Sequence, residues 1–378
     1  MKTTRRIVTA AALLLGTFGT TVAGAADLPF TANAAGHEPP FRIGVSNGYI
    51  GNTWRAQFVA DIEKVAEEFK AEGDVAEVTI LNSTSGASGQ LTQVNSLINS
   101  GVDALLINPE STEALKPVIA RALASGILVV IGDNPMGHPN AISITLDQNQ
   151  FWGIQTEWLV DQLKGKGNIV SIEGIAGVTG SELRVAARDE VLAKNPDIKL
   201  LASVPGGWDQ AKAREVMSSL LTAHDQIDGV LIQDVMADGV VRAYDTSGRT
   251  LPPMSGDYVH SFLKLWKSRP DINAITVTNP PGIGASSLRF VVALLRGHQL
   301  NPDVLQPSPA DPSIANTILL PEPTVVTREA ETDKPWCNEG TECIGLDEAL
   351  ARLEGQPDST ALDGMLTQQQ VLDRYFLK

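Results

Sequence analysis

Cysteine is nearly absent from this sequence, which has two among its 378 residues. Both lie near the C-terminus, where Cys337 and Cys343 enclose the short loop Asn-Glu-Gly-Thr-Glu. In an oxidising compartment, two cysteines this close are expected to form a disulfide. A zinc site would need further ligands of the right type nearby, and the sequence offers none there. We therefore predict a local disulfide, with no metal site and no redox centre.

Long hydrophobic runs are also missing beyond the N-terminus, since no later stretch has the roughly 18 apolar residues of a membrane-spanning helix. Residues 1–25 are predicted to be a signal peptide, with a cationic start, an apolar core at 7–15 and small residues at 23–25. A second small-residue site at 32–34 leaves two possible starts for the mature chain, after residue 25 or after residue 34. We expect an exported, soluble protein that uses the general secretory route and works in the periplasm.

Positive charge is scarce, with 29 lysines and arginines against 44 acidic residues and a net charge of −15. The predicted signal carries three basic residues and no acidic one, so its removal takes the net charge to about −18. An acidic surface of this kind argues against nucleic acid or an anionic membrane as a partner. The phosphate-binding pattern GxxxxGK[ST] is absent as well.

What the sequence does contain is a regular alternation of short apolar runs and amphipathic segments, typical of α/β proteins. The expected strands cover residues 41–46, 76–82, 103–107, 127–131, 168–172, 198–203, 228–232, 251–256 and 274–278. The expected helices cover residues 54–72, 86–100, 112–125, 181–194, 209–223, 236–246 and 283–297. Runs such as 104–107 and 127–131 are apolar throughout, as parallel strands buried on both faces require. The length predicts two doubly wound parallel-sheet domains.

Polar side chains follow most of these strands, at the edge where open parallel sheets bind ligands. In chain order they are Asn52, Trp54, Arg55, Asn82, Ser83, Thr84, Asn108, Asp133, Asn134, Glu173, Arg184, Trp208, Asp209, Gln233, Asp234, Asp257 and Asn279. The set has many planar donors and acceptors and no histidine or cysteine, which suits the hydroxyl groups of a neutral polyhydroxylated ligand. Trp54 and Trp208 are candidate platforms for the C–H faces of a sugar ring. Each position also has an ordinary explanation, since Asp209 and Asp257 could be helix caps or turn residues.

Several segments resemble the ribose-type periplasmic solute-binding proteins of sugar ABC transporters. They are GNTWR (51–55), QLTQVNSLINSGVDALLINP (90–109), VVIGDN (129–134), IEGIAGVTGSELR (172–184), LIQD (231–234), SGD (255–257) and TNPPGIG (278–284). The Trp54-Arg55 pair is similar to the galactofuranose-type branch of the family. The resemblance implies two lobes joined by three crossovers, the type I fold, with one ligand closed between the lobes and delivered to a membrane permease.

The resemblance also places the ligand contacts. They would be Asn52, Trp54, Arg55, Asp133 and Asn134 in the first lobe, and Arg184, Trp208, Asp234, Asp257 and Asn279 in the second. Three of them depart from the family pattern, because Asn134 stands for arginine, Asp234 for asparagine and Asn279 for glutamine. No catalytic residue, metal or cofactor is implied.

The implied first lobe comprises residues 41–147 and 279–318, and the second lobe comprises 148–278 and 319–326. Hinge crossovers are expected near 146–149, 277–281 and 318–324. Residues 327–378 have no counterpart in the compact ribose binders, and we expect them to pack on the outside of a lobe. We expect a monomer.

Two other functions were weighed. A sensory receptor for a chemotaxis or kinase partner would use the same binding chemistry, so the sequence does not separate it from a transport protein. A secreted carbohydrate enzyme is a more remote alternative, because arginines and amides surround the candidate carboxylates. A repressor of the same two-lobe fold is excluded, since an export signal stands where its helix-turn-helix would be. The ligand itself stays open among furanoses, pyranoses and linear polyols, with nucleoside-like or autoinducer-type molecules as the remaining alternative.

Overall fold

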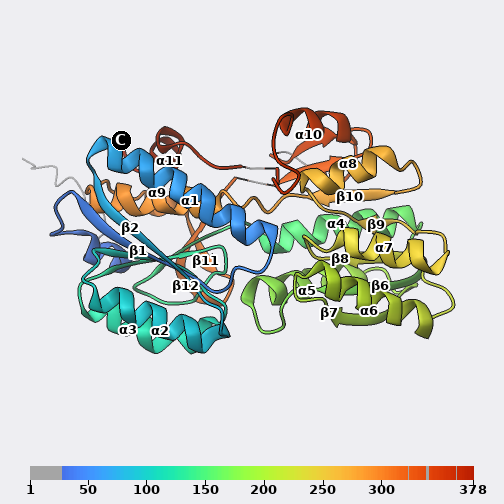
Figure 1. Cartoon of the computed structure of the whole chain (residues 1–378), viewed down its shortest axis with the longest axis horizontal. Coiled ribbons are helices and arrows are strands. Elements are labelled where there is room, and N and C mark those ends of the chain that lie inside the picture. Colours follow the sequence, from blue (N-terminus) through green and yellow to red (C-terminus); the bar gives the residue numbers. More distant parts are fainter. Residues whose placement is uncertain (1–27, 322, 338–339, 363) are drawn as a thin grey trace, which may run out of the picture.

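The computed structural model describes residues 28–321, 323–337, 340–362 and 364–378, and the predicted signal peptide lies outside them. These residues form two α/β lobes that lie side by side, each built around a seven-stranded sheet (Figure 1). The predicted α/β class and the two doubly wound sheets are confirmed. Within the described residues, no helix has the length and apolar character needed to cross a membrane.

The first lobe has the strand order β11-β12-β5-β4-β3-β1-β2, and only the β11–β12 pair is antiparallel. Its strands are β1 Phe41–Asn47, β2 Val75–Asn82, β3 Ala104–Asn108, β4 Leu128–Gly132, β5 Ile142–Thr145, β11 Leu305–Ser308 and β12 Asp311–Leu319. Its main helices are α1 Thr53–Glu72, α2 Gly86–Asn99, α3 Thr112–Ala124 and α9 Ile283–Leu295. Helices α1 and α9 pack together on one face of the sheet, and α2 and α3 on the other (Figure 1).

The second lobe has the strand order β14-β13-β10-β9-β8-β6-β7, in which β10 and β13 are antiparallel. Its strands are β6 Gly167–Glu173, β7 Ile198–Pro205, β8 Gly229–Ile232, β9 Met254–Ser255, β10 Ala274–Val277, β13 Thr324–Thr327 and β14 Glu342–Gly345. Its helices are α4 Gln148–Gln162, α5 Thr179–Ala193, α6 Gln210–Ala223, α7 Ala237–Ser247, α8 His260–Ser268 and α10 Leu346–Arg352.

Local sequence explains most of these elements. Strands β3 and β4 are buried along their whole length, as their unbroken apolar runs predict. Helix α1 begins where the Asn52 side chain accepts a hydrogen bond from the Arg55 N–H, and it ends at Gly73 with a positive φ of 84°. The strand expected at 251–256 is wrong in extent, because only β9 forms there. Prolines 252 and 253 cannot donate to the sheet ladder.

Three connections join the lobes before the C-terminal tail begins. They run from β5 to α4, from β10 to α9 and from β12 to β13. Each connection leaves the carboxyl end of a strand. All three therefore pass beside the edge at which the parallel strands of both sheets have their carboxyl ends. The site described below lies at that edge.

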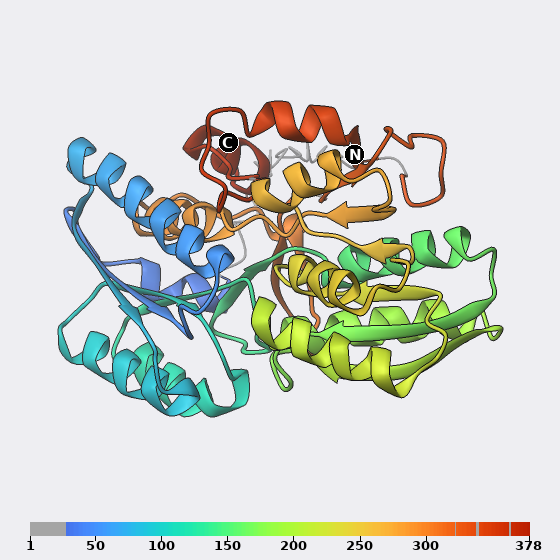
Figure 2. The ribbon, with the colours of Figure 1, turned by 45° about the vertical axis from the view of Figure 1, so that its right-hand side comes forward.

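The tail beyond residue 327 differs from the expectation that it packs on one lobe. Strand β14 pairs in parallel with β13 and so extends the second sheet, and α10 packs beside α8. The chain then returns to the first lobe, where α11 Gln368–Tyr375 packs on α9. Figure 2 shows this last part of the chain, in red, lying across both lobes. The alternation of strands and helices in the sequence does not predict that the chain returns to the first lobe.

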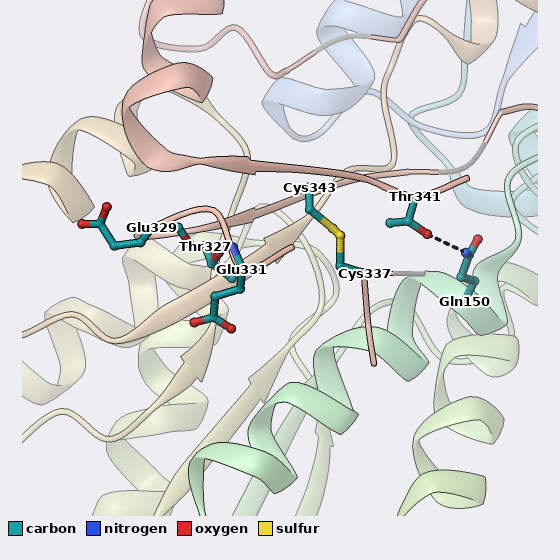
Figure 3. The surroundings of a disulfide bond; sticks show 7 residues. All are labelled: Gln150, Thr327, Glu329, Glu331, Cys337, Thr341 and Cys343. Carbon is teal, nitrogen blue, oxygen red and sulfur yellow. Dashed lines mark hydrogen bonds between the residues drawn. A yellow bond between two sulfur atoms is a disulfide. The ribbon is translucent and has the colours of Figure 1, made fainter. Parts of the chain in front are cut away.

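The predicted disulfide between Cys337 and Cys343 is present and closes the loop that leads into β14 (Figure 3). Beside it, the Gln150 amide of α4 donates a hydrogen bond to the Thr341 hydroxyl at 3.4 Å. The disulfide thus joins two residues of the tail, and the hydrogen bond between Gln150 and Thr341 links the loop that it closes to α4 of the second lobe.

Candidate ligand-binding site

A small cavity lies between the lobes, at the carboxyl ends of both sheets. Its lining residues are Tyr49, Asn52, Trp54, Arg55, Asp133, Asn134, Gln148, Gly180, Arg184, Trp208, Asp234, Val235 and Asn279. Nine of the ten ligand contacts proposed from the sequence are in this set, and Asp257 is not. The structure therefore brings the polar strand ends of both lobes to one place.

Trp54 and Arg55 enter the cavity from the first turn of α1. The Trp54 ring stacks on Phe58 with centroids 5.5 Å apart, and its indole N–H donates to the backbone carbonyl of Asn279 at 2.6 Å. Arg55 is 4 % exposed and donates to the Asn47 side-chain oxygen at 2.8 Å. Its guanidinium also lies 5.2 Å from the centroid of the Tyr49 ring. These contacts fix both side chains before any ligand arrives.

Asp133 follows β4 in a left-handed conformation, with φ 69°. Its carboxylate accepts hydrogen bonds from the side-chain amides of Asn108 at 3.3 Å, Asn134 at 3.2 Å and Asn279 at 3.4 Å. Burial raises the pKa of this carboxyl, while Arg55 lowers it. An aspartate held by three amides and facing a guanidinium is a ready acceptor for ligand hydroxyls.

Arg184 is the corresponding cation of the second lobe and is 3 % exposed. It donates to the Asp234 carboxylate and to the Gln148 side-chain oxygen, both at 2.7 Å. Its guanidinium lies 4.2 Å from the centroid of the Phe151 ring. Two of its five N–H groups are thus bonded within the protein, and Arg184 lines the cavity with donors that these bonds do not use.

Trp208 also lines the cavity, from a left-handed backbone conformation with φ 54°. A Cβ atom at position 174 would lie 2.3 Å from Cε2 of its ring, so only glycine fits there. Within the described residues, the buried Trp208 indole N–H has no hydrogen-bond partner. A buried donor without a partner in the wall of a polar cavity is available to a ligand oxygen.

Two asparagines bridge the lobes directly. The Asn134 side-chain oxygen accepts from the Gly180 N–H at 3.2 Å, and the Asn52 amide donates to the Trp208 carbonyl at 3.3 Å. The Asn52 oxygen is already used to cap α1. Both residues line the cavity, but most of their side-chain donors and acceptors are already hydrogen-bonded to other groups of the protein.

Asp257 lies behind the cavity wall. Its carboxylate accepts the Tyr258 N–H at 2.9 Å, and the Tyr258 hydroxyl lies 2.8 Å from Asp234. Burial raises the pKa of Asp257 to about 8, with a further rise from the nearby Asp234 carboxylate. In this arrangement Asp257 therefore lies behind the residues that line the cavity, and its predicted ligand contact stays a prediction.

This burial predicts a pH dependence of stability that the Asp257→Asn variant should remove. The pKa of Asp257 is about 8 in the folded protein and about 3.9 when unfolded, so between about pH 4 and pH 8 only the folded state holds the proton. The free energy of unfolding should therefore fall as pH rises from 5 to 8, by up to about 1.4 kcal/mol per pH unit from this group. Urea unfolding at pH 5, 6, 7 and 8 measures it, and equal slopes for both proteins would contradict the assignment.

Sequence reasoning missed Tyr49, Gln148, Gly180 and Val235, all of which line the cavity. Tyr49 and Gln148 lie in a loop and at the start of α4, so a rule that inspects only the residue after each strand passes over them. Asp209 is a helix cap, since its carboxylate accepts the Lys212 N–H at 2.7 Å. The described residues contain no group of three histidine, cysteine or acidic side chains that could hold a metal ion.

A family model described as periplasmic binding protein domain matches residues 43–299. The xylitol-binding protein of Mycolicibacterium smegmatis is 31 % identical over 76 % of this chain and 83 % of its own length. The ribose import binding protein of Bacillus subtilis is 26 % identical over 72 % of this chain and 88 % of its own length.

Solved structures agree on the fold. An ABC transporter solute-binding protein from Thermobispora bispora has a TM-score of 0.73 at 24 % identity, covering 88 % of this chain and 94 % of its own. A galactofuranose-binding protein has a TM-score of 0.67 at 20 % identity, covering 83 % and 98 %. The predicted type I fold is confirmed. The chain belongs to the periplasmic binding protein family, among the sugar-binding proteins of ABC transporters.

Proposed function

We propose that this protein captures a neutral sugar or polyol between its lobes and delivers it to an ABC transporter permease. The observation that carries the proposal is the charge balance of the cavity, where the two cations Arg55 and Arg184 face the two carboxylates Asp133 and Asp234. A buried cavity of zero net charge favours a ligand without charge, because any added charge would lack a partner.

The proposed contacts with the ligand are made by the cavity side chains that can form further hydrogen bonds. Asp133 and Asp234 accept hydrogen bonds from ligand hydroxyls, while Arg55 and Arg184 donate hydrogen bonds to the ligand oxygens. Trp54 and Trp208 supply apolar faces for the C–H groups. The names of the relatives, which include xylitol-, ribose- and allose-binding proteins, support a small polyhydroxylated ligand. Binding would stabilise the closed arrangement of the lobes, because only there do both half-sites contact the ligand.

We further propose that the chain is exported to the periplasm as a monomer, with the signal removed after residue 25. Residues Pro29–Ala34 form a short helix in which Phe30 and Ala34 are buried. The Asn33 amide donates to the Leu123 and Ile127 carbonyls at 2.8 and 3.1 Å. Cleavage after residue 34 would remove this packed segment, which favours the earlier site.

A thermal-shift screen of the mature protein tests the proposed ligand class. The panel holds pentoses, hexoses in both ring forms and linear polyols, with gluconate and ribose 5-phosphate as charged comparators. At a hundredfold excess over its dissociation constant, a ligand should add about 2.7 kcal/mol of stability and raise the Tm by several degrees. The neutral compounds should give the hits. A shift with the charged compounds alone, or none with any sugar or polyol when the protein is folded and free of co-purified ligand, would overturn the proposal.

A further inference from the structure

The C-terminal residues 353–362 and 364–378, here called the strap, make a fourth connection between the lobes. The strap leaves α10 in the second lobe and ends with α11 on the first lobe (Figure 2). It follows the three connections of the hinge in sequence and lies beside two of them, because residues of the strap and of both connections line one cavity. The proposed function does not use this segment.

On the second lobe the strap is held through backbone hydrogen bonds. The N–H groups of Ser261 and His260 donate to the carbonyls of Asp358 and Thr360 at 2.9 and 2.8 Å. The Leu362 N–H donates to the Tyr258 carbonyl at 3.0 Å. Because the Tyr258 hydroxyl reaches Asp234 and the Asn279 carbonyl, one residue joins the strap to the wall of the ligand cavity.

On the first lobe the strap meets α1 and α9. The Ala361 N–H donates to the Gln57 side-chain oxygen at 2.8 Å, and the Leu366 N–H donates to the Ser286 hydroxyl at 3.0 Å. Further along, Tyr375 packs its ring on Phe290 with centroids 5.0 Å apart. Ala361 is therefore bonded to the first lobe while it also forms a β-bridge with Val259 of the second.

The strap lies on the side of the hinge opposite the ligand cavity. Asn279 faces the ligand cavity, whereas its neighbours Thr278 and Pro280 line a second cavity of about 350 Å³. The same second cavity is lined by Gln57 and by strap residues such as Ala361. When lobes rotate open about a hinge, surfaces behind the hinge move relative to one another. Contacts between the lobes behind the hinge are therefore lost or compressed when the lobes rotate away from the arrangement seen here.

We propose that the strap is a built-in brake on lobe opening, which raises the closed population and slows ligand release. The inference rests on the proposed function in that it requires lobes that open and close. Contacts present in only one arrangement favour that arrangement by their own free energy. Ala361 supplies such a contact, because its bond to Gln57 and its bridge to Val259 hold the two lobes at a fixed separation behind the hinge.

The test uses the full mature chain with Gln57→Ala and Ser286→Ala, singly and together. Each change removes an acceptor for a strap N–H and leaves the hinge connections intact. Gln57→Glu keeps an acceptor oxygen and should behave as the unaltered protein. Asp358→Ala is the matched control, since it breaks the strap's ion pair with Lys264 within the second lobe and touches no contact between lobes.

Two readouts separate this inference from the ligand assignment. Small-angle scattering of the ligand-free protein should show a larger radius of gyration for the double variant. Stopped-flow release of a ligand from the screen should be about threefold to tenfold faster for each single variant. Thermal melts establish that each variant is folded. A folded double variant with an unchanged radius and release rate would overturn the brake. The scattering result decides the question even if no sugar or polyol binds.

Discussion

Replacing Asp133 with asparagine should weaken ligand binding by about 2–5 kcal/mol, which is roughly thirtyfold to several-thousandfold in Kd. The change keeps the size of the side chain and suits the backbone, because asparagine tolerates the φ of 69° found there. It replaces an acceptor oxygen with an amide that would face the donors Asn108, Asn134 and Asn279. It also removes the negative charge beside Arg55, leaving that buried cation without its main partner.

Isothermal titration with a ligand from the screen measures this effect. The matched control is Asp103→Asn, because Asp103 lies just before β3, at the opposite end of the same sheet. There it accepts hydrogen bonds from His37 at 2.8 Å and from the Arg42 N–H at 2.7 Å. The control variant should bind as the unaltered protein does. An Asp133→Asn protein that is folded and binds with unchanged affinity would remove Asp133 from the site.

The fold class was predictable because parallel strands buried on both faces leave an unmistakable pattern. The run expected at 103–107 is β3, Ala104–Asn108, and every residue of β3 is buried. Short strands and the returning tail were not predictable in this way. Strand β9 has only two residues, and the position of α11 depends on contacts with α9 that no local pattern encodes.

The location of the site was predictable for a related reason. Parallel strands place their carboxyl ends at one edge, so the residues that follow them meet wherever the sheet forms. The direction of a side chain at that edge was not predictable. Asp257 follows β9 as Asp133 follows β4, yet its carboxylate accepts the Tyr258 N–H and is not part of the cavity lining. Asn52 and Asn134 line the cavity, but each also forms a hydrogen bond to a backbone group of the second lobe.

Asn134 also shows why departures from a family pattern carry information. The resemblance implies an arginine at this position, whereas the cationic side chains that line this cavity are Arg55 and Arg184. A third guanidinium would give the lining a net positive charge. With asparagine the two cations and two carboxylates balance, which is the property on which the proposed neutral ligand depends.

Replacing Arg184 with methionine should abolish measurable binding of the same ligand. The change leaves an unbranched side chain beside the Phe151 ring and removes the guanidinium donors to Asp234 and Gln148. Asp234 is then left as a buried carboxylate that accepts a hydrogen bond from the Tyr258 hydroxyl but has lost its cation. Loss of one member of a buried charge pair costs about 2–5 kcal/mol, and the donors to the ligand are lost as well. A fall in affinity of at least about a thousandfold is expected.

Arg188→Met provides a matched control on the same helix, one turn beyond Arg184. Arg188 is equally buried and pairs with Glu173 and Asp189, but it does not line the cavity. Both variants should lose stability, since Arg184→Met leaves the buried Asp234 and Arg188→Met leaves the half-buried Glu173 without its cation. Only Arg184→Met should lose binding, when both are titrated at a temperature well below their melting transitions. Equal losses would mean that the binding defect comes from general damage to α5, and unchanged binding by Arg184→Met would exclude the guanidinium as a ligand contact.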